Sequence, residues 1–144
     1  MRIWKGAVAT VFGLMLSVGL QAQEQREIRY EQCVRVIEAM VSEDLPALNA
    51  EVTPEVHAQM TSTDIRSLIG QIKAILPNLG DDIPPIEEMT TFYVTKETDA
   101  GFEEMENYAF IYGEWVLYFV YTESGGEKIT GYNLTLKENI RSLN

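Results

Sequence analysis

The sequence predicts an α+β domain in which N-terminal helices pack on a curved antiparallel four-stranded meander sheet. After residue 22, apolar residues recur at three- and four-residue spacing through the first half of the chain, as in helices that pack on a core. Four strand-like runs joined by short turns then fill the second half, and helices followed by strands indicate an α+β arrangement. The chain has 144 residues, of which 46% are hydrophobic, so it is long enough for one domain.

Residues 1–22 have the pattern of a secretory signal peptide. Two basic residues precede an apolar stretch over residues 7–20, and small Ala22 offers a cleavage point before Gln23. The apolar stretch is short for a membrane span, so we expect cleavage; an uncleaved membrane anchor is the alternative. We therefore expect an exported protein, periplasmic or extracellular, whose residues 23–144 form a single domain with no stable membrane anchor.

Three helices are expected next. An apolar stripe predicts the first, and Leu45-Pro46 is expected to end it. A short second helix is predicted from Thr53, a suitable N-cap, with proline at the first helical position. The third is expected to start near Thr61, with Asp64 completing a pair similar to a capping box, and to stop at a proline. The stripe of the first helix consists of Tyr30, Cys33, Val34, Ile37, Met40 and Val41.

The four strand-like runs lie at roughly 89–97, 104–112, 115–123 and 127–136. Gly113-Glu114 fits a two-residue hairpin of the type that requires glycine first. Turn residues also separate the other runs, which predicts an antiparallel meander.

The third strand is apolar on both faces, whereas a sheet with one solvated face alternates apolar with polar residues. One face would carry Trp115, Leu117, Phe119 and Tyr121, and the other Val116, Tyr118 and Val120. Helices can cover one face, so a partner subunit, another protein or a ligand is expected to cover the other. Partly exposed aromatic side chains are the alternative. This pattern favours a homodimer formed through the sheet face.

Charge and composition exclude several classes of function. The chain has 22 acidic against 11 basic residues, a net charge of -11, which argues against binding nucleic acid or anionic lipid. One cysteine and one histidine exclude an internal disulfide framework, a cysteine-rich zinc site and any site that needs two imidazoles. The acidic pairs Asp81-Asp82 and Glu87-Glu88 match no calcium-binding loop. We expect neither a metal nor a cofactor.

Several segments resemble an uncharacterised bacterial domain family with the nuclear transport factor 2-like (cystatin-like) fold. They are residues 43–48 (EDLPAL), 52–56 (VTPEV), 63–68 (TDIRSL), 114–119 (EWVLYF) and 127–132 (EKITGY). The resemblance covers about residues 27–137. It implies a cone-like domain with a cavity at its wide end and homodimers that pack through the convex face of the sheet. That superfamily hosts isomerases, cyclases, dehydratases, adaptors and proteins without known activity, so the resemblance implies no single function.

The candidate site residues are mainly aromatic. We expect a ligand pocket or interface to involve Tyr108, Phe110, Tyr112, Trp115, Tyr118, Phe119 and Tyr132. Catalysis has only two candidates. His57 is the one imidazole, and Glu106 shares strand parity with Tyr108, with which it could form an acid–base pair. The structural alternatives are a surface histidine and a solvated strand end.

Three functions are consistent with these features. The first is non-catalytic binding of an apolar or amphipathic small molecule in the cone, which requires that side chains do not fill it. The second is a protein–protein interaction or scaffold role in the cell envelope that uses the apolar sheet face. The third is an isomerase or lyase, for which the chain lacks a convincing dyad.

Overall fold

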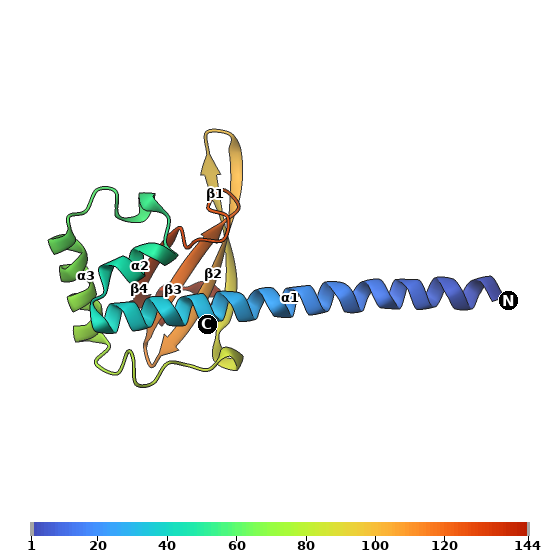
Figure 1. Cartoon of the computed structure of the whole chain (residues 1–144), viewed down its shortest axis with the longest axis horizontal. Helices are drawn as coiled ribbons and strands as arrows, with labels where there is room; N and C mark the ends of the chain where they lie inside the picture. The colour runs from blue at the N-terminus through green and yellow to red at the C-terminus, as the bar shows by residue number, and fades with distance from the viewer. Residues whose placement is uncertain (1, 144) are drawn as a thin grey trace.

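The computed structural model describes residues 2–143, and the side chains of residues 19–143. Within these residues, the helices α1 (Arg2–Ser42), α2 (Leu45–Glu51) and α3 (Ser62–Ile75) precede all the strands. The strands β1 (Thr90–Thr98), β2 (Gly101–Tyr112), β3 (Trp115–Thr122) and β4 (Gly131–Leu136) form one antiparallel sheet in the order β1-β2-β3-β4. The predicted α+β class, with helices packed on a four-stranded meander, is confirmed (Figure 1).

Helix α1 crosses the sheet and continues well past it at its N-terminal end (Figure 1). Residues 19–25 are exposed, and Arg26 is the first side chain that fastens the helix to the body. Its guanidinium donates to the Thr91 hydroxyl at 3.1 Å and to the carbonyl oxygens of Ile86, at 2.9 Å, and Met89. The predicted cleavage site after Ala22 therefore lies in the projecting part of the helix.

Most side chains of the predicted signal peptide lie outside the described part of the chain, so this segment stays a prediction. No helix in the described part combines the length and apolarity that a membrane-spanning segment needs.

The connection from α1 to α2 differs from the prediction. Helix α1 ends at Ser42, because Glu43 adopts a left-handed conformation with φ of 54°. Leu45-Pro46, expected to end the first helix, instead begins α2, where the Asp44 side chain accepts from the Ala47 amide at 3.1 Å. Proline suits the first turn of a helix as well as the end of one, so this dipeptide did not decide between the two.

Two of the predicted local signals are confirmed, and two of the predicted elements differ in the structure. The Thr61 hydroxyl and the Asp64 carboxylate cap α3 reciprocally, so the predicted capping box is confirmed. The predicted helix at Thr53 is a single 3-10 turn, η1 (Pro54–His57). Gly113 has φ of 65°, as its hairpin requires. Strand β4 begins four residues later than expected, because residue Ile129 pairs instead with Val52 in an isolated bridge.

The main core lies between the helices and one face of the sheet. Phe110 is fully buried at its centre, where its ring stacks on Tyr30 at 5.9 Å and meets Phe119 edge-on at 5.8 Å. Tyr108, Leu117 and Tyr121 belong to the same buried cluster. The space that the helices enclose with these strands is therefore packed with side chains.

The opposite face of the sheet carries a smaller cluster, made by Phe92, Ala109 and Val116. Ile140 and Leu143, from the last turns of the chain, pack against it. Val116 is fully buried without any second molecule. The cover expected from a partner or ligand is thus supplied in part by the chain's own C-terminal segment, and the homodimer stays a prediction.

Candidate functional site

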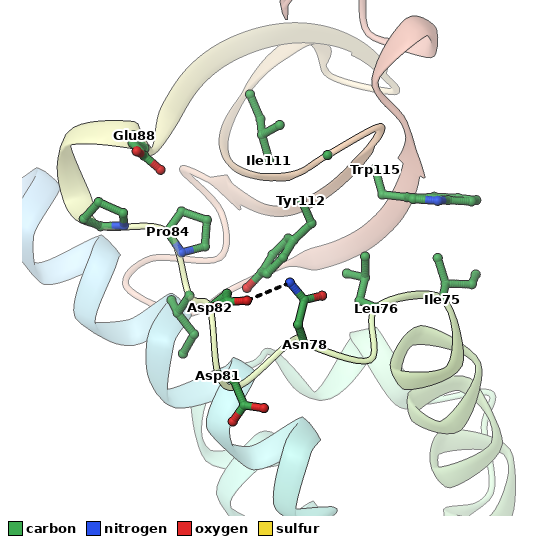
Figure 2. A pocket seen from close by; sticks show the side chains of 13 residues that line it. Ile75, Leu76, Asn78, Asp81, Asp82, Pro84, Glu88, Ile111, Tyr112 and Trp115 are labelled. Carbon is green, nitrogen blue, oxygen red and sulfur yellow. Dashed lines mark hydrogen bonds between the residues drawn. The ribbon is translucent and has the colours of Figure 1, made fainter.

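A groove of about 630 Å³ lies at one end of the sheet, between the loop that follows α3 and the hairpin joining β2 to β3 (Figure 2). Its apolar walls include Ile75, Leu76, Ile83, Pro84, Ile111 and Trp115. Its polar groups include Asn78, Asp81, Asp82 and Glu88. The groove therefore combines apolar and aromatic surface with carboxylates, all from segments that meet only in the folded chain.

Tyr112 fixes the geometry of this groove. Its buried side chain donates a hydrogen bond to the carbonyl oxygen of Leu79 at 3.1 Å, which ties the loop after α3 to the sheet. Burial raises the pKa of Tyr112, so the hydroxyl stays neutral. The hydroxyl of Tyr30, on α1, donates to the carbonyl oxygen of Pro84 in the same loop at 2.9 Å. The loop after α3 is thus held at two points, by hydrogen bonds from β2 and from α1 to its backbone.

The groove is electronegative. Asp82 accepts from the side-chain amide of Asn78 at 3.2 Å (Figure 2), while Asp81 and Glu88 are exposed. No lysine or arginine is among the described residues that line it. Carboxylates beside an apolar wall favour a positively charged group on a bound molecule.

The structure separates the seven aromatic residues expected at a pocket or interface. Tyr112 and Trp115 pair directly across β2 and β3, and both line the groove. Tyr118 lies on the opposite face of the sheet, where its ring meets Phe92 edge-on. Tyr108, Phe110 and Phe119 belong to the main core, and Tyr132 borders a separate cavity of about 230 Å³ beside α3.

The two catalytic candidates have different partners. His57 Nδ1 lies 3.0 Å from the amide oxygen of Asn49, and Nε2 lies 2.7 Å from the hydroxyl of Tyr132. The amide oxygen can only accept, so Nδ1 carries the proton and Nε2 accepts from Tyr132. Glu106 instead accepts from the hydroxyl of Tyr108, the pairing that their shared strand parity suggested.

Burial of this imidazole has a consequence for stability. Desolvation lowers the pKa of His57 from its ordinary 6.5 and raises that of Tyr132 to about 12, so both groups are neutral near pH 7. The bonded histidine fastens η1 and α2 to β4. It acts here as a structural tie, because its ring nitrogens are both engaged within the chain.

We expect the stability that depends on His57 to fall as the pH is lowered. Its pKa is lower in the folded chain, so the unfolded chain binds the proton more readily. This contribution is complete above the unfolded pKa of 6.5 and is lost as the pH falls below it. Urea unfolding from about pH 7.5 to about pH 5.5 measures the slope. His57→Gln should flatten it, since the chain has no other histidine. An unchanged slope in the variant would contradict the assignment.

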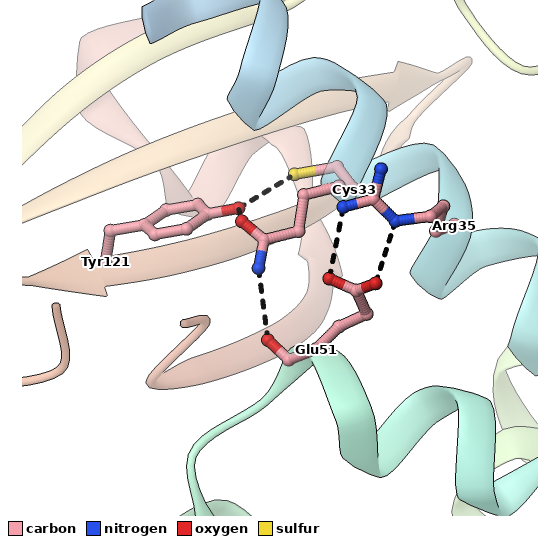
Figure 3. Close-up of polar contacts among 5 residues, drawn as sticks. Cys33, Arg35, Glu51 and Tyr121 are labelled. Atoms are coloured by element: carbon pink, nitrogen blue, oxygen red, sulfur yellow. Dashed lines mark hydrogen bonds and ion pairs between the residues drawn. The ribbon is translucent and has the colours of Figure 1, made fainter. Parts of the chain in front are cut away.

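A polar network that the sequence did not indicate joins α1 to the sheet (Figure 3). The hydroxyl of Tyr121 donates to the amide oxygen of Gln32 at 2.7 Å, and the Gln32 amide nitrogen donates to the Glu51 carbonyl oxygen at 3.3 Å. The Tyr121 proton is used in this way, so the Cys33 thiol, 3.8 Å away, is the donor to the tyrosine oxygen. Burial raises the pKa of Cys33 to about 12, which makes the thiol unreactive.

No group of three or more acidic, histidine or cysteine side chains in the described part of the chain is placed to hold a metal ion. Comparison with protein-family models, curated proteins and solved structures found no match to this chain. The resemblance to nuclear transport factor 2-like domains therefore stays a prediction, and the site is interpreted from its own geometry.

Proposed function

We propose that the protein binds a small amphipathic molecule with a positively charged group, without converting it, in the groove lined by Tyr112 and Trp115. The observation that carries the proposal is the groove itself. Its volume of about 630 Å³ is in the range of small-molecule sites. Its lining joins apolar side chains to an amide and three carboxylates, which suits a molecule with both an apolar and a charged part.

The arrangement of the aromatic residues favours a binding site in the groove over one in the interior of the domain. Phe110 and Phe119 pack against each other beneath the helices, where the sequence suggested a cavity. Trp115, by contrast, is partly buried and lines the groove, and Figure 2 shows its ring on the side of Ile75 and Leu76, away from the carboxylates. The carboxylates attract an organic cation, while the apolar wall accommodates an alkyl or aryl group.

Tryptophan fluorescence tests this proposal directly. Trp115 is the only tryptophan in residues 23–144, so its emission reports occupancy of the groove. The probes share one tail and differ in charge: octyltrimethylammonium, octanol and octanoate, each below its micelle concentration. We expect the cation to bind about tenfold more tightly than the anion, because the groove is electronegative.

Matched charge variants distinguish binding in the groove from non-specific attraction of a cation to an acidic protein. Asp81→Asn should weaken the cation by roughly threefold, as expected for an exposed ion pair. Asp99→Asn, which removes the same charge in the turn between β1 and β2, should leave the affinity unchanged. Equal binding of all three probes, or equal losses in both variants, would refute a specific groove.

A further inference from the structure

The outer edge of β1 is an open sheet edge. Strand β1 pairs with β2 on one side, and no strand of the described chain runs along its other side. Residues 93–97 are all exposed, and the β1–β2 hairpin extends beyond the other strands (Figure 1). Half of the backbone N–H and C=O groups of an edge strand point away from its neighbour, so this edge offers unpaired donors and acceptors.

Large apolar side chains flank this edge on both faces of the sheet. Tyr93 is 59% exposed and Val94 is 42% exposed, and successive residues of a strand point to opposite faces. Phe102, 78% exposed, lies on β2, one strand in from the edge, directly across from Glu97 and so on the same face as Tyr93. An added strand would therefore find apolar contacts above and below it.

The edge lacks most of the features that prevent strand addition. The register between β1 and β2 runs without a bulge from Thr90 to Thr98, and the strand contains no proline. Lys96 is its only basic residue. A nine-residue regular edge with exposed apolar side chains is suited to pairing with another extended segment.

The charge of the β1–β2 hairpin indicates which kind of segment can pair with the β1 edge. Residues 93–106 contain one lysine and five acidic residues, Glu97, Asp99, Glu103, Glu104 and Glu106. A second copy of this hairpin would bring like charges together, which disfavours self-pairing. A segment with lysine or arginine beside apolar residues would instead have opposite charge and matching apolar contacts.

We propose that residues 93–97 of β1 bind an extended basic segment of another protein, which adds to the sheet as a fifth strand. Backbone hydrogen bonds along the edge provide affinity for any extended chain. Tyr93 offers an apolar contact on one face of the sheet and Val94 on the other, and the acidic hairpin selects lysine and arginine. This site is separate from the groove, since β2 runs from the hairpin tip at Gly101 to the groove at Tyr112.

The test uses the full chain and a dye-labelled peptide of four Lys-Val repeats with blocked ends. Fluorescence anisotropy gives its affinity, and amide hydrogen exchange shows where it binds. We expect slower exchange within residues 93–97 and a dissociation constant in about the micromolar range. A peptide with proline at one central valine should bind about tenfold more weakly, because proline interrupts the strand. A Glu-Val peptide should not bind.

Matched variants at exposed residues ensure that a loss of affinity does not come from unfolding of the protein. Tyr93→Ser with Val94→Ser should weaken the peptide by about tenfold, since both side chains are exposed and contribute little to the fold. Ile28→Ser, which changes an apolar residue of α1 that is 50% exposed, should not weaken it. Protection elsewhere, equal binding of the proline peptide, no binding, or self-association through β1 would each overturn the proposal.

Discussion

Replacing Phe110 with alanine is expected to destabilise the protein by about 3–5 kcal/mol, the range for loss of a fully buried phenylalanine. Phe110 is completely buried and joins α1 to the sheet through its contacts with Tyr30 and Phe119. The cavity left behind has walls on both layers, so neither can relax into it fully. Urea unfolding monitored by circular dichroism measures the change in free energy.

Phe102→Ala is the matched control for this prediction. It makes the same substitution on the same strand, at a side chain that is 78% exposed. Its effect should stay within about 0.5 kcal/mol. Similar losses in the two variants would contradict the assignment of Phe110 to a single core between the helices and the sheet.

Arg29→Ala is expected to cost about 2–4 kcal/mol, through loss of a desolvated cation–π contact and a charged hydrogen bond. The guanidinium lies 3.9 Å from the centroid of the Tyr121 ring and donates to the carbonyl oxygen of Glu127 at 3.0 Å. Arg29 is only 8% exposed, so water cannot replace these contacts when the side chain is removed. Thermal and urea unfolding measure the loss.

Arg35→Ala provides the comparison on the same helix. Arg35 pairs with Glu51 at 2.7 Å, but its side chain is half exposed, so removal should cost at most about 1 kcal/mol. The two variants share the same change in helix propensity. Equal destabilisation by the two variants would contradict the burial of Arg29. It would also contradict the packing of α1 on the sheet that this burial reflects.

The elements that were predictable from the sequence depend on local chemistry. Thr61 and Asp64 cap one helix within a single turn, and Gly113 sets its hairpin by its own backbone conformation. Strand parity likewise placed Glu106 beside Tyr108. In each case the residues that decide the structure lie within a few positions of one another, so a single sequence contains the full signal.

Contacts between distant segments were not predictable in the same way. The bond from His57 to Tyr132 joins residues 75 positions apart, and nothing in either neighbourhood indicates the other. Strand parity indicated which β2 side chains share a face but not where that face ends: Phe110 and Tyr112 both belong to the main core, and only Tyr112 also lines the groove. The C-terminal segment over Val116 was missed because two isolated apolar residues have no periodicity.

Native mass spectrometry of residues 23–144, purified from the organism that makes the protein, tests the central claim most directly. The account predicts that the protein retains a small cationic molecule, and that Trp115→Ala loses it while Phe102→Ala keeps it. The same spectrum reports whether the chain is the predicted homodimer. A bare protein, or an adduct retained equally by both variants, would contradict binding in the groove.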